Sequence, residues 1–88
     1  MAMNNANDDL VNIRDLGLAA ALICADYKSV GTRRDEDGRV YFFFLKSADL
    51  NAIIDDYWAY ALSLDARRYS EALKAAKSQI YNERSSRS

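Results

Sequence analysis

Hydrophobic and polar positions follow two different periods along the 88-residue chain. Over residues 13–25 the apolar positions recur at helical spacing, which predicts a helix with Asn12 as its N-cap. Gly17 lies inside this predicted helix, where glycine costs about 1 kcal/mol relative to alanine. A glycine at that position indicates a close contact with a neighbouring element.

Residues 28–34 and 39–45 are predicted to form a β-hairpin, because they are strand-like segments separated by an acidic turn that contains Gly38. A three-residue loop over residues 36–38 pairs Asp35 with Arg39 and lets glycine take the positive φ angle. A four-residue loop would shift the register by one residue and exchange the two faces. We favour the three-residue loop, since a type I turn followed by a left-handed glycine is a common hairpin connection.

Both faces of the second predicted strand are apolar, so simple alternation fails there. In the favoured register, the residues that face the protein interior are Val30, Thr32, Val40, Phe42 and Phe44. The residues that face outward, beside Gly31 and Arg33, are Tyr41, Phe43 and Leu45. Either helices pack on each side of the hairpin, or the outward residues form a surface for a partner.

Two further helices are predicted after the hairpin, capped by Ser47 and Asp65. The first carries the cleanest amphipathic stripe of the chain: Leu50, Ile53, Ile54, Tyr57, Trp58, Ala61 and Leu62. The second, over residues 66–83, has a thinner stripe: Tyr69, Ala72, Leu73, Ala76 and Ile80. The chain is therefore predicted to be a single α+β domain over residues 10–83 in the order α-β-β-α-α, with a mobile arm at 1–9 and a frayed tail at 84–88.

Composition argues against most enzyme classes. The chain has no histidine and only one cysteine, Cys24, so histidine base catalysis and a zinc site of Cys and His ligands are excluded. Cys24 falls in the apolar stripe of the first predicted helix, which favours a core thiol. Asp55 and Asp56 point about 100° apart on a helix, so with Asp49 they indicate a solvated face. We predict a non-enzymatic protein without a metal or another cofactor.

Targeting signals are also absent from the sequence. The first nine residues contain neither a basic region nor an apolar run of the kind found in signal peptides. No apolar run approaches the roughly 20 residues of a membrane helix. A cytoplasmic protein without membrane contact is expected.

The charge is unevenly distributed although the net charge is only −1. Residues 1–65 carry six basic and eleven acidic side chains, whereas residues 66–88 carry six basic and two acidic ones. The basic and aromatic residues of the hairpin and last helix could bind a nucleic-acid backbone: Arg33, Arg34, Arg39, Arg67, Lys74, Lys77, Tyr81 and Arg84. The acidic hairpin tip and a pI of about 5.3 argue against this alternative.

Several short motifs carry a resemblance to a known family: Arg14-Asp15-Leu16, Arg39-Val40-Tyr41-Phe42, Asp56-Tyr57-Trp58, Asp65-Ala66-Arg67-Arg68-Tyr69, and the helix ending over residues 73–81. On these residues the chain resembles a small domain family of unknown function from bacteria, phages and mobile elements. Such chains tend to have proline after the capping aspartate, where this one has Ala66. The resemblance implies a fold and a genomic setting, and no activity.

The sequence therefore favours a small protein-binding accessory factor of a phage or mobile element, such as an inhibitor or adaptor of a host or defence complex. The predicted binding residues are Tyr41, Phe43, Leu45 and Arg33. The expected partner is another protein or a second copy of the chain, because exposed apolar patches and open hairpin edges both favour association. The alternative is a nucleic-acid-binding accessory module.

Overall fold

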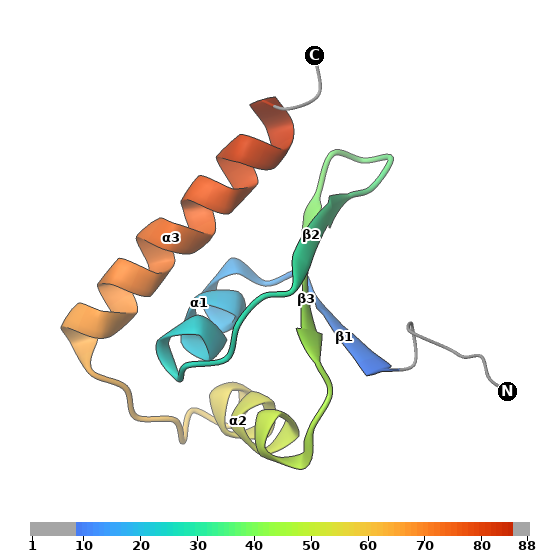
Figure 1. The fold of residues 1–88 in the computed structure, drawn as a ribbon. Helices are drawn as coiled ribbons and strands as arrows, with labels where there is room; N and C mark the ends of the chain where they lie inside the picture. The colour runs from blue at the N-terminus through green and yellow to red at the C-terminus, as the bar shows by residue number, and fades with distance from the viewer. Residues whose placement is uncertain (1–8, 86–88) are drawn as a thin grey trace, which may run out of the picture.

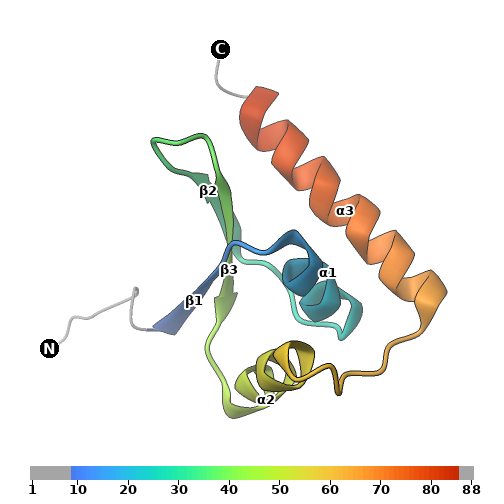
Figure 2. The same ribbon diagram turned by 180° about the vertical axis from the view of Figure 1, so that it is seen from behind.

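Helices and strands form two layers in the computed structural model, which describes residues 9–85 and the side chains of residues 9–83. Within this range, three helices lie on one side of a three-stranded antiparallel sheet (Figure 1, Figure 2). The elements are β1 (Leu10–Ile13), α1 (Leu16–Cys24), β2 (Gly31–Arg34), β3 (Val40–Leu45), α2 (Ala48–Trp58) and α3 (Ala66–Ser85). The predicted α+β class is confirmed, whereas the predicted order lacked the first strand.

The strand β1 corrects the sequence prediction at the start of the domain. Residues 10–13 pair antiparallel with β3. The predicted N-cap Asn12 therefore lies in β1, and Asp15 caps α1 instead, accepting a hydrogen bond from the backbone N–H of Leu18 at 2.8 Å. Asparagine and aspartate are both good N-caps, so the local pattern alone is ambiguous. Backbone hydrogen bonding to β3 decides between them.

The hairpin register is the one predicted. Thr32 lies opposite Phe42, and Gly31 lies opposite Phe43. The strand β2 begins at Gly31 rather than at residue 28. Val30 therefore lies outside the strand and is 53% exposed, which corrects its predicted inward position.

Asp35 organises the hairpin loop. Its N–H donates to the carbonyl of Arg39 at 2.9 Å, and its carboxylate accepts from the N–H groups of Asp37 and Arg39 at 2.9 and 3.0 Å. Gly38 has a φ angle of +86°, a conformation that L side chains rarely adopt. The three-residue loop is therefore confirmed, and it determines which side chains of β3 face inward.

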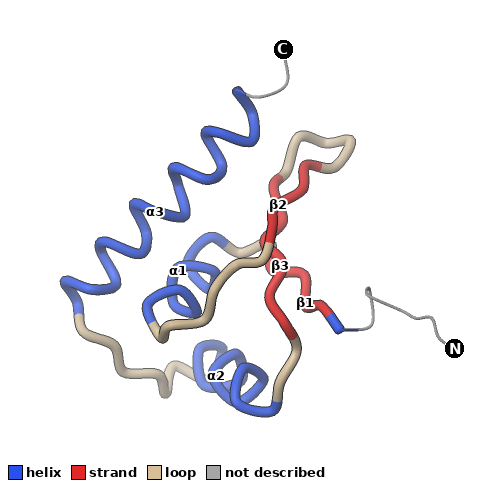
Figure 3. The backbone as a smooth tube through the Cα atoms, viewed as in Figure 1, coloured by secondary structure: helices blue, strands red, loops and turns tan. Residues whose placement is uncertain are grey.

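The central strand β3 supplies the middle of the core, and the strand order is β1-β3-β2 (Figure 3). Val40, Phe42 and Phe44 are buried, as predicted. Each of the three helices contributes to the buried cluster that contains Phe42 and Phe44, through Leu18, Ala19 and Leu22 of α1, Leu50 of α2 and Ala76 of α3. All the described helices therefore pack on this inner face, and helices on both sides of the hairpin are not observed.

The helix α3 packs through small residues. Asp65 caps it as predicted, accepting from the N–H of Arg68 at 2.9 Å, and Ala72 and Ala76 are buried. The helix continues to Ser85, two residues past its predicted end. Alanines at the contact allow α3 to approach α1 closely, as the thin apolar stripe predicted.

The helix α2 is capped by Ser47 as predicted and ends earlier than its apolar stripe indicates. Trp58 is its last residue and is 58% exposed, which corrects the predicted core position. Tyr60 adopts a φ angle of +61°, and the N–H of Ala61 bonds back to the carbonyl of Asp56 at 2.8 Å. This left-handed cap terminates the helix, so Ala61 and Leu62 leave it.

Gly17 makes the close contact that its position predicted. A β-carbon added there would lie 2.5 Å from the Tyr57 hydroxyl oxygen. That hydroxyl donates to the Asp15 carboxylate at 3.1 Å, and the Tyr69 hydroxyl donates to the Gly17 carbonyl at 3.2 Å. One turn of α1 is therefore held by tyrosines from both C-terminal helices.

Tyr57 makes the stability of the fold sensitive to alkaline pH. Burial, followed by its hydrogen bond to Asp15, raises the pKa of Tyr57 from 10.0 to about 12. The fold therefore favours the neutral phenol, and this contribution is complete below pH 10 and declines as the pH rises from 10 toward 12. Denaturation curves across this range should show falling stability, with a shallower fall for Tyr57→Phe. An equally steep fall in that variant would assign the effect to other groups.

Cys24 is buried at the end of α1, as predicted for a core thiol. Arg68 of α3 covers this helix end, donating to the Cys24 carbonyl and to the Asp26 carboxylate, each at 3.1 Å. No helix in the described part of the chain is long and apolar enough to cross a bilayer. Most of the predicted arm over residues 1–9 and of the predicted tail over residues 84–88 lies outside the described residues, whereas residues 84 and 85 belong to α3 rather than to a frayed tail.

Candidate binding surface

The side of the sheet that faces away from the helices is here called the outer face. It is made by alternate residues of the three strands and by one residue just after β1: Leu10, Asn12, Arg14, Gly31, Arg33, Tyr41, Phe43 and Leu45. Figure 1 and Figure 2 show the three described helices on the opposite side of the sheet. Nothing within residues 9–85 covers the outer face as the helices cover the inner one.

An apolar row runs along the outer face. Phe43 is half-buried in its middle, between Asn12 of β1 and Gly31 of β2. Leu45 is 60% exposed and lies opposite Leu10. Because Gly31 has no side chain, one flank of the Phe43 ring has no neighbour at the paired position, so a ligand can approach the ring from that side.

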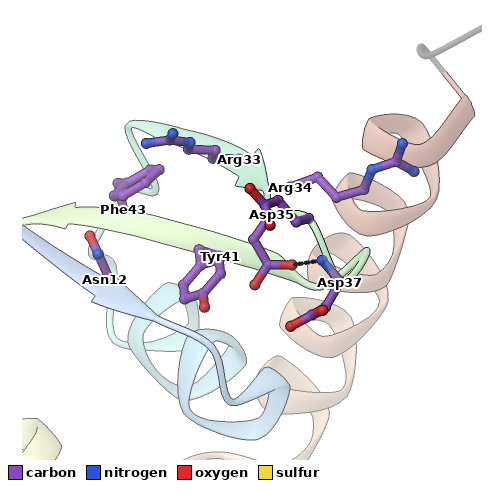
Figure 4. A pocket seen from close by; sticks show the side chains of 8 residues that line it. Asn12, Arg33, Arg34, Asp35, Asp37, Tyr41 and Phe43 are labelled. Atoms are coloured by element: carbon purple, nitrogen blue, oxygen red, sulfur yellow. Dashed lines mark hydrogen bonds between the residues drawn. The ribbon is translucent and has the colours of Figure 1, made fainter.

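The other end of the outer face is cationic around Tyr41. The guanidinium carbon of Arg14 lies 5.6 Å from the centre of the Tyr41 ring, a cation–π distance. Arg33 lies opposite Tyr41 on β2, and its side chain extends toward Phe43 (Figure 4). Both arginines are exposed. The face therefore combines aromatic rings with two positive charges that a partner can reach.

Asp35 borders this cationic end. Acting as the hydrogen-bond acceptor for the phenol, the Asp35 carboxylate raises the pKa of Tyr41, and partial burial acts in the same direction. The positive charge of Arg14 opposes this effect. The Tyr41 phenol therefore lies between a carboxylate that accepts its hydrogen bond and a cation over its ring.

Two adjoining hollows shape the outer face. One, of about 560 Å³, lies beside the hairpin tip, where Tyr41, Asp35 and Asp37 form part of its wall (Figure 4). The other, of about 640 Å³, extends toward Leu10. Both are lined by Asn12, Arg33 and Phe43. The surface is open and shallow, a shape suited to a partner surface rather than to an enclosed small ligand.

The structure brings the predicted protein-binding residues together. Arg33, Tyr41, Phe43 and Leu45 all belong to the outer face, as the hairpin register predicted. The sequence prediction missed the residues contributed by the first strand and its end, namely Leu10, Asn12 and Arg14. The polar Asn12 between the β-branched residues Val11 and Ile13 is the signal that could have identified this strand.

The predicted nucleic-acid-binding residues do not form one surface. Arg33 lies on the outer face, whereas Arg34 extends toward α3 on the helical side of the sheet (Figure 4). Lys74, Lys77 and Tyr81 are exposed along α3. Arg39 is exposed beside the hairpin loop, and Arg67 lies in the first turn of α3. The side chain of Arg84 lies outside the described residues.

The described residues form no metal-binding cluster. Among residues 9–83 no group of three or more His, Cys, Asp or Glu side chains could hold a metal ion. Asp49, Asp55 and Asp56 are exposed, and Cys24 is buried.

Comparison of this chain with protein-family models, with curated proteins and with solved structures finds no match.

Proposed function

We propose that this chain is a small protein-binding accessory factor that contacts its partner through the outer face. The observation that carries the proposal is the row of Tyr41, Phe43 and Leu45 on the central strand, to which the described helices give no cover. Monomeric soluble proteins rarely leave a contiguous apolar patch exposed unless it binds something. Tyrosine, phenylalanine and arginine are enriched in protein interfaces, and all three residue types occur here.

The charges around this row indicate which chemical groups the partner surface presents. Arg14 and Arg33 flank Tyr41, and the acidic hairpin tip lines the same hollow, so the matching surface offers both carboxylates and cationic groups at this end. Toward Leu45 and Leu10 the outer face is apolar and fits aliphatic or aromatic side chains. A protein surface can present both chemistries at the required spacing.

A protein partner fits this surface better than a nucleic acid does. The acidic residues of the hairpin tip, Asp35, Glu36 and Asp37, line the same hollow as Arg33 and would repel phosphates. The exposed lysines of α3 lie on the helical side of the sheet, so they do not reinforce the arginines of the outer face. This charge distribution favours a protein partner over a nucleic acid.

The resemblance to a family from bacteria, phages and mobile elements suggests where such a factor acts. In that setting the chain would act in the cytoplasm as an inhibitor or an adaptor of a host or defence complex. Its described residues contain no metal-binding cluster, which fits a binding role. Binding by one open face also suits an inhibitor, because it occupies the partner surface without needing a pocket.

Partner capture by the outer face is expected to depend on Phe43. Phe43→Asp places a carboxylate in the middle of the apolar row and should remove most captured protein, because the centre of an interface carries much of its binding energy. The measurement is affinity capture from host lysate with quantitative mass spectrometry. Tyr60→Asp is the matched control, since Tyr60 is an exposed aromatic residue elsewhere, at 97% exposure.

Circular dichroism and a melting curve establish that both variants fold. If folded Phe43→Asp captures the same proteins in the same amounts as the native chain, the outer face is not the binding surface. Gel-shift experiments with DNA and RNA at low salt test the alternative function. Nucleic-acid binding that is abolished by replacing Lys74 and Lys77 with glutamate would support the nucleic-acid module.

A further inference from the structure

The strand β1 presents an open hydrogen-bonding edge. The carbonyl of Asp9 accepts from the N–H of Lys46 at 2.8 Å, so the odd-numbered residues of this segment direct their backbone groups toward β3. The N–H and C=O groups of Leu10 and Asn12 therefore point the other way. Within the described residues, β1 has β3 as its neighbour on one side and no strand on the other.

The edge lacks the features that usually prevent strand addition. Natural edge strands are commonly protected by charged side chains, proline or a bulge. The sequence of β1, Leu-Val-Asn-Ile, has no charge and no proline, and its pairing with β3 is continuous. The other edge strand, β2, carries Arg33 and Arg34, and its Thr32 hydroxyl bonds to Glu83 of α3 at 2.8 Å. Only the β1 edge is thus both free and uncharged in the described structure.

We propose that β1 pairs antiparallel with β1 of a second copy of this chain, around a two-fold axis perpendicular to the sheet. The product is a continuous six-stranded sheet with all helices on one side. The two-fold axis brings each residue near its own copy, which is costly for charged strands, so an uncharged strand is suited to self-pairing. A three-stranded sheet in an 88-residue chain also gains stability from extension.

Charge selects one register for this pairing. Opposed residues must share a face, and the ladder must form through Leu10 and Asn12. Registers centred on Val11 or on Asn12 meet these conditions and pair at least three residues of the four-residue strand with its copy. The register centred on Asn12 would oppose Asp9 to Asp15 of the second copy, twice. The register centred on Val11 avoids this repulsion and pairs Leu10 with Asn12 of the second copy, twice.

The pairing also covers apolar surface. Val11 is half-buried and packs at the margin of the main core, so its own copy would shield it on the inner side. On the outer side the two copies would join their outer faces into one surface. This self-association does not rest on the proposed partner binding, because it uses backbone groups at the edge of β1 rather than the apolar row of the outer face.

Cysteine cross-linking tests both the pairing and its register. In the proposed ladder Val11 faces its own copy in a non-hydrogen-bonded pair, where Cα atoms lie about 4.5 Å apart, within the range that a disulfide spans. In a Cys24→Ala background, Val11→Cys should form a covalent dimer on mild oxidation. Asn12→Cys is the matched control and should remain mostly monomeric, because it faces Leu10 of the second copy.

Light scattering tests the native chain. The expected mass is twice the 9.9 kDa of one chain, and Asn12→Pro should give a folded monomer, since the missing N–H is one that β3 does not use. Asn12→Thr should remain dimeric. Phe43→Asp should also remain dimeric even if it loses the partner, which separates this inference from the proposed function.

Two kinds of result would overturn the inference. The first is a native chain that stays monomeric at every soluble concentration, with no cross-link through Val11→Cys. The second is a dimer that Asn12→Pro leaves intact, or one that cross-links through Asn12→Cys and not through Val11→Cys.

Discussion

Replacing Phe42 with alanine is expected to lower the free energy of unfolding by about 3–5 kcal/mol, the usual cost of removing a buried phenylalanine ring. Phe42 is fully buried, and it lies in the cluster to which all three helices contribute. A chain of this size has a total stability of roughly 5–15 kcal/mol, so the loss is a large part of it. Chemical denaturation followed by circular dichroism measures the change.

Phe43→Ala is the matched comparison for Phe42→Ala, because the two residues are adjacent on β3 and differ only in the face they occupy. Phe43→Ala should cost less than about half as much, since its ring lies on the outer face. Should Phe42→Ala be too unstable to purify, Phe42→Leu offers a milder truncation. Equal losses at both positions would contradict the register on which the outer face depends.

Gly17→Ala is expected to destabilise the fold even though alanine is the better helix former. The added methyl group would lie 2.5 Å from the Tyr57 hydroxyl oxygen and displace it from the Asp15 carboxylate. A hydrogen bond to a charged group contributes about 1.5–3 kcal/mol, whereas alanine gains about 1 kcal/mol over glycine in a helix. The net loss should be about 0.5–2 kcal/mol in thermal or chemical denaturation.

Tyr57→Phe provides the control for this clash. Without the Tyr57 hydroxyl group, the methyl group added at position 17 no longer overlaps with that oxygen. Gly17→Ala should therefore be close to neutral or stabilising in the Tyr57→Phe background. The coupling between the two changes measures the close contact directly. Additive effects would show that Gly17 acts through helix propensity alone.

The hairpin could be predicted from the sequence because the residues that specify it are close together along the chain. The acidic turn with Gly38 selects a three-residue loop, and that loop determines which residues of β3 share a face. Tyr41, Phe43, Leu45 and Arg33 could therefore be assigned to one outward surface before the fold was known. The caps Ser47 and Asp65 are equally local, and both occur as predicted.

Residues Leu10 to Arg14 could not be assigned to the outer face in the same way. They join the sheet by pairing with residues of β3 that lie far along the chain, and Asn12 has good helix-capping chemistry of its own. Trp58 is a further residue whose environment the local pattern did not predict. Its spacing fits the apolar stripe of α2, but the helix ends there and leaves the indole ring largely exposed.

The sequence by itself determined the α+β class, the hairpin with its register, the helix caps Ser47 and Asp65 and the aromatic row of the outer face, because each depends on neighbouring residues. The tertiary structure alone decided that β1 is a strand, that all described helices pack on one side, and that the outer face extends onto β1. These features depend on hydrogen bonds and packing between distant segments. Such contacts are settled by the balance among competing arrangements of the whole chain, which a local pattern does not contain.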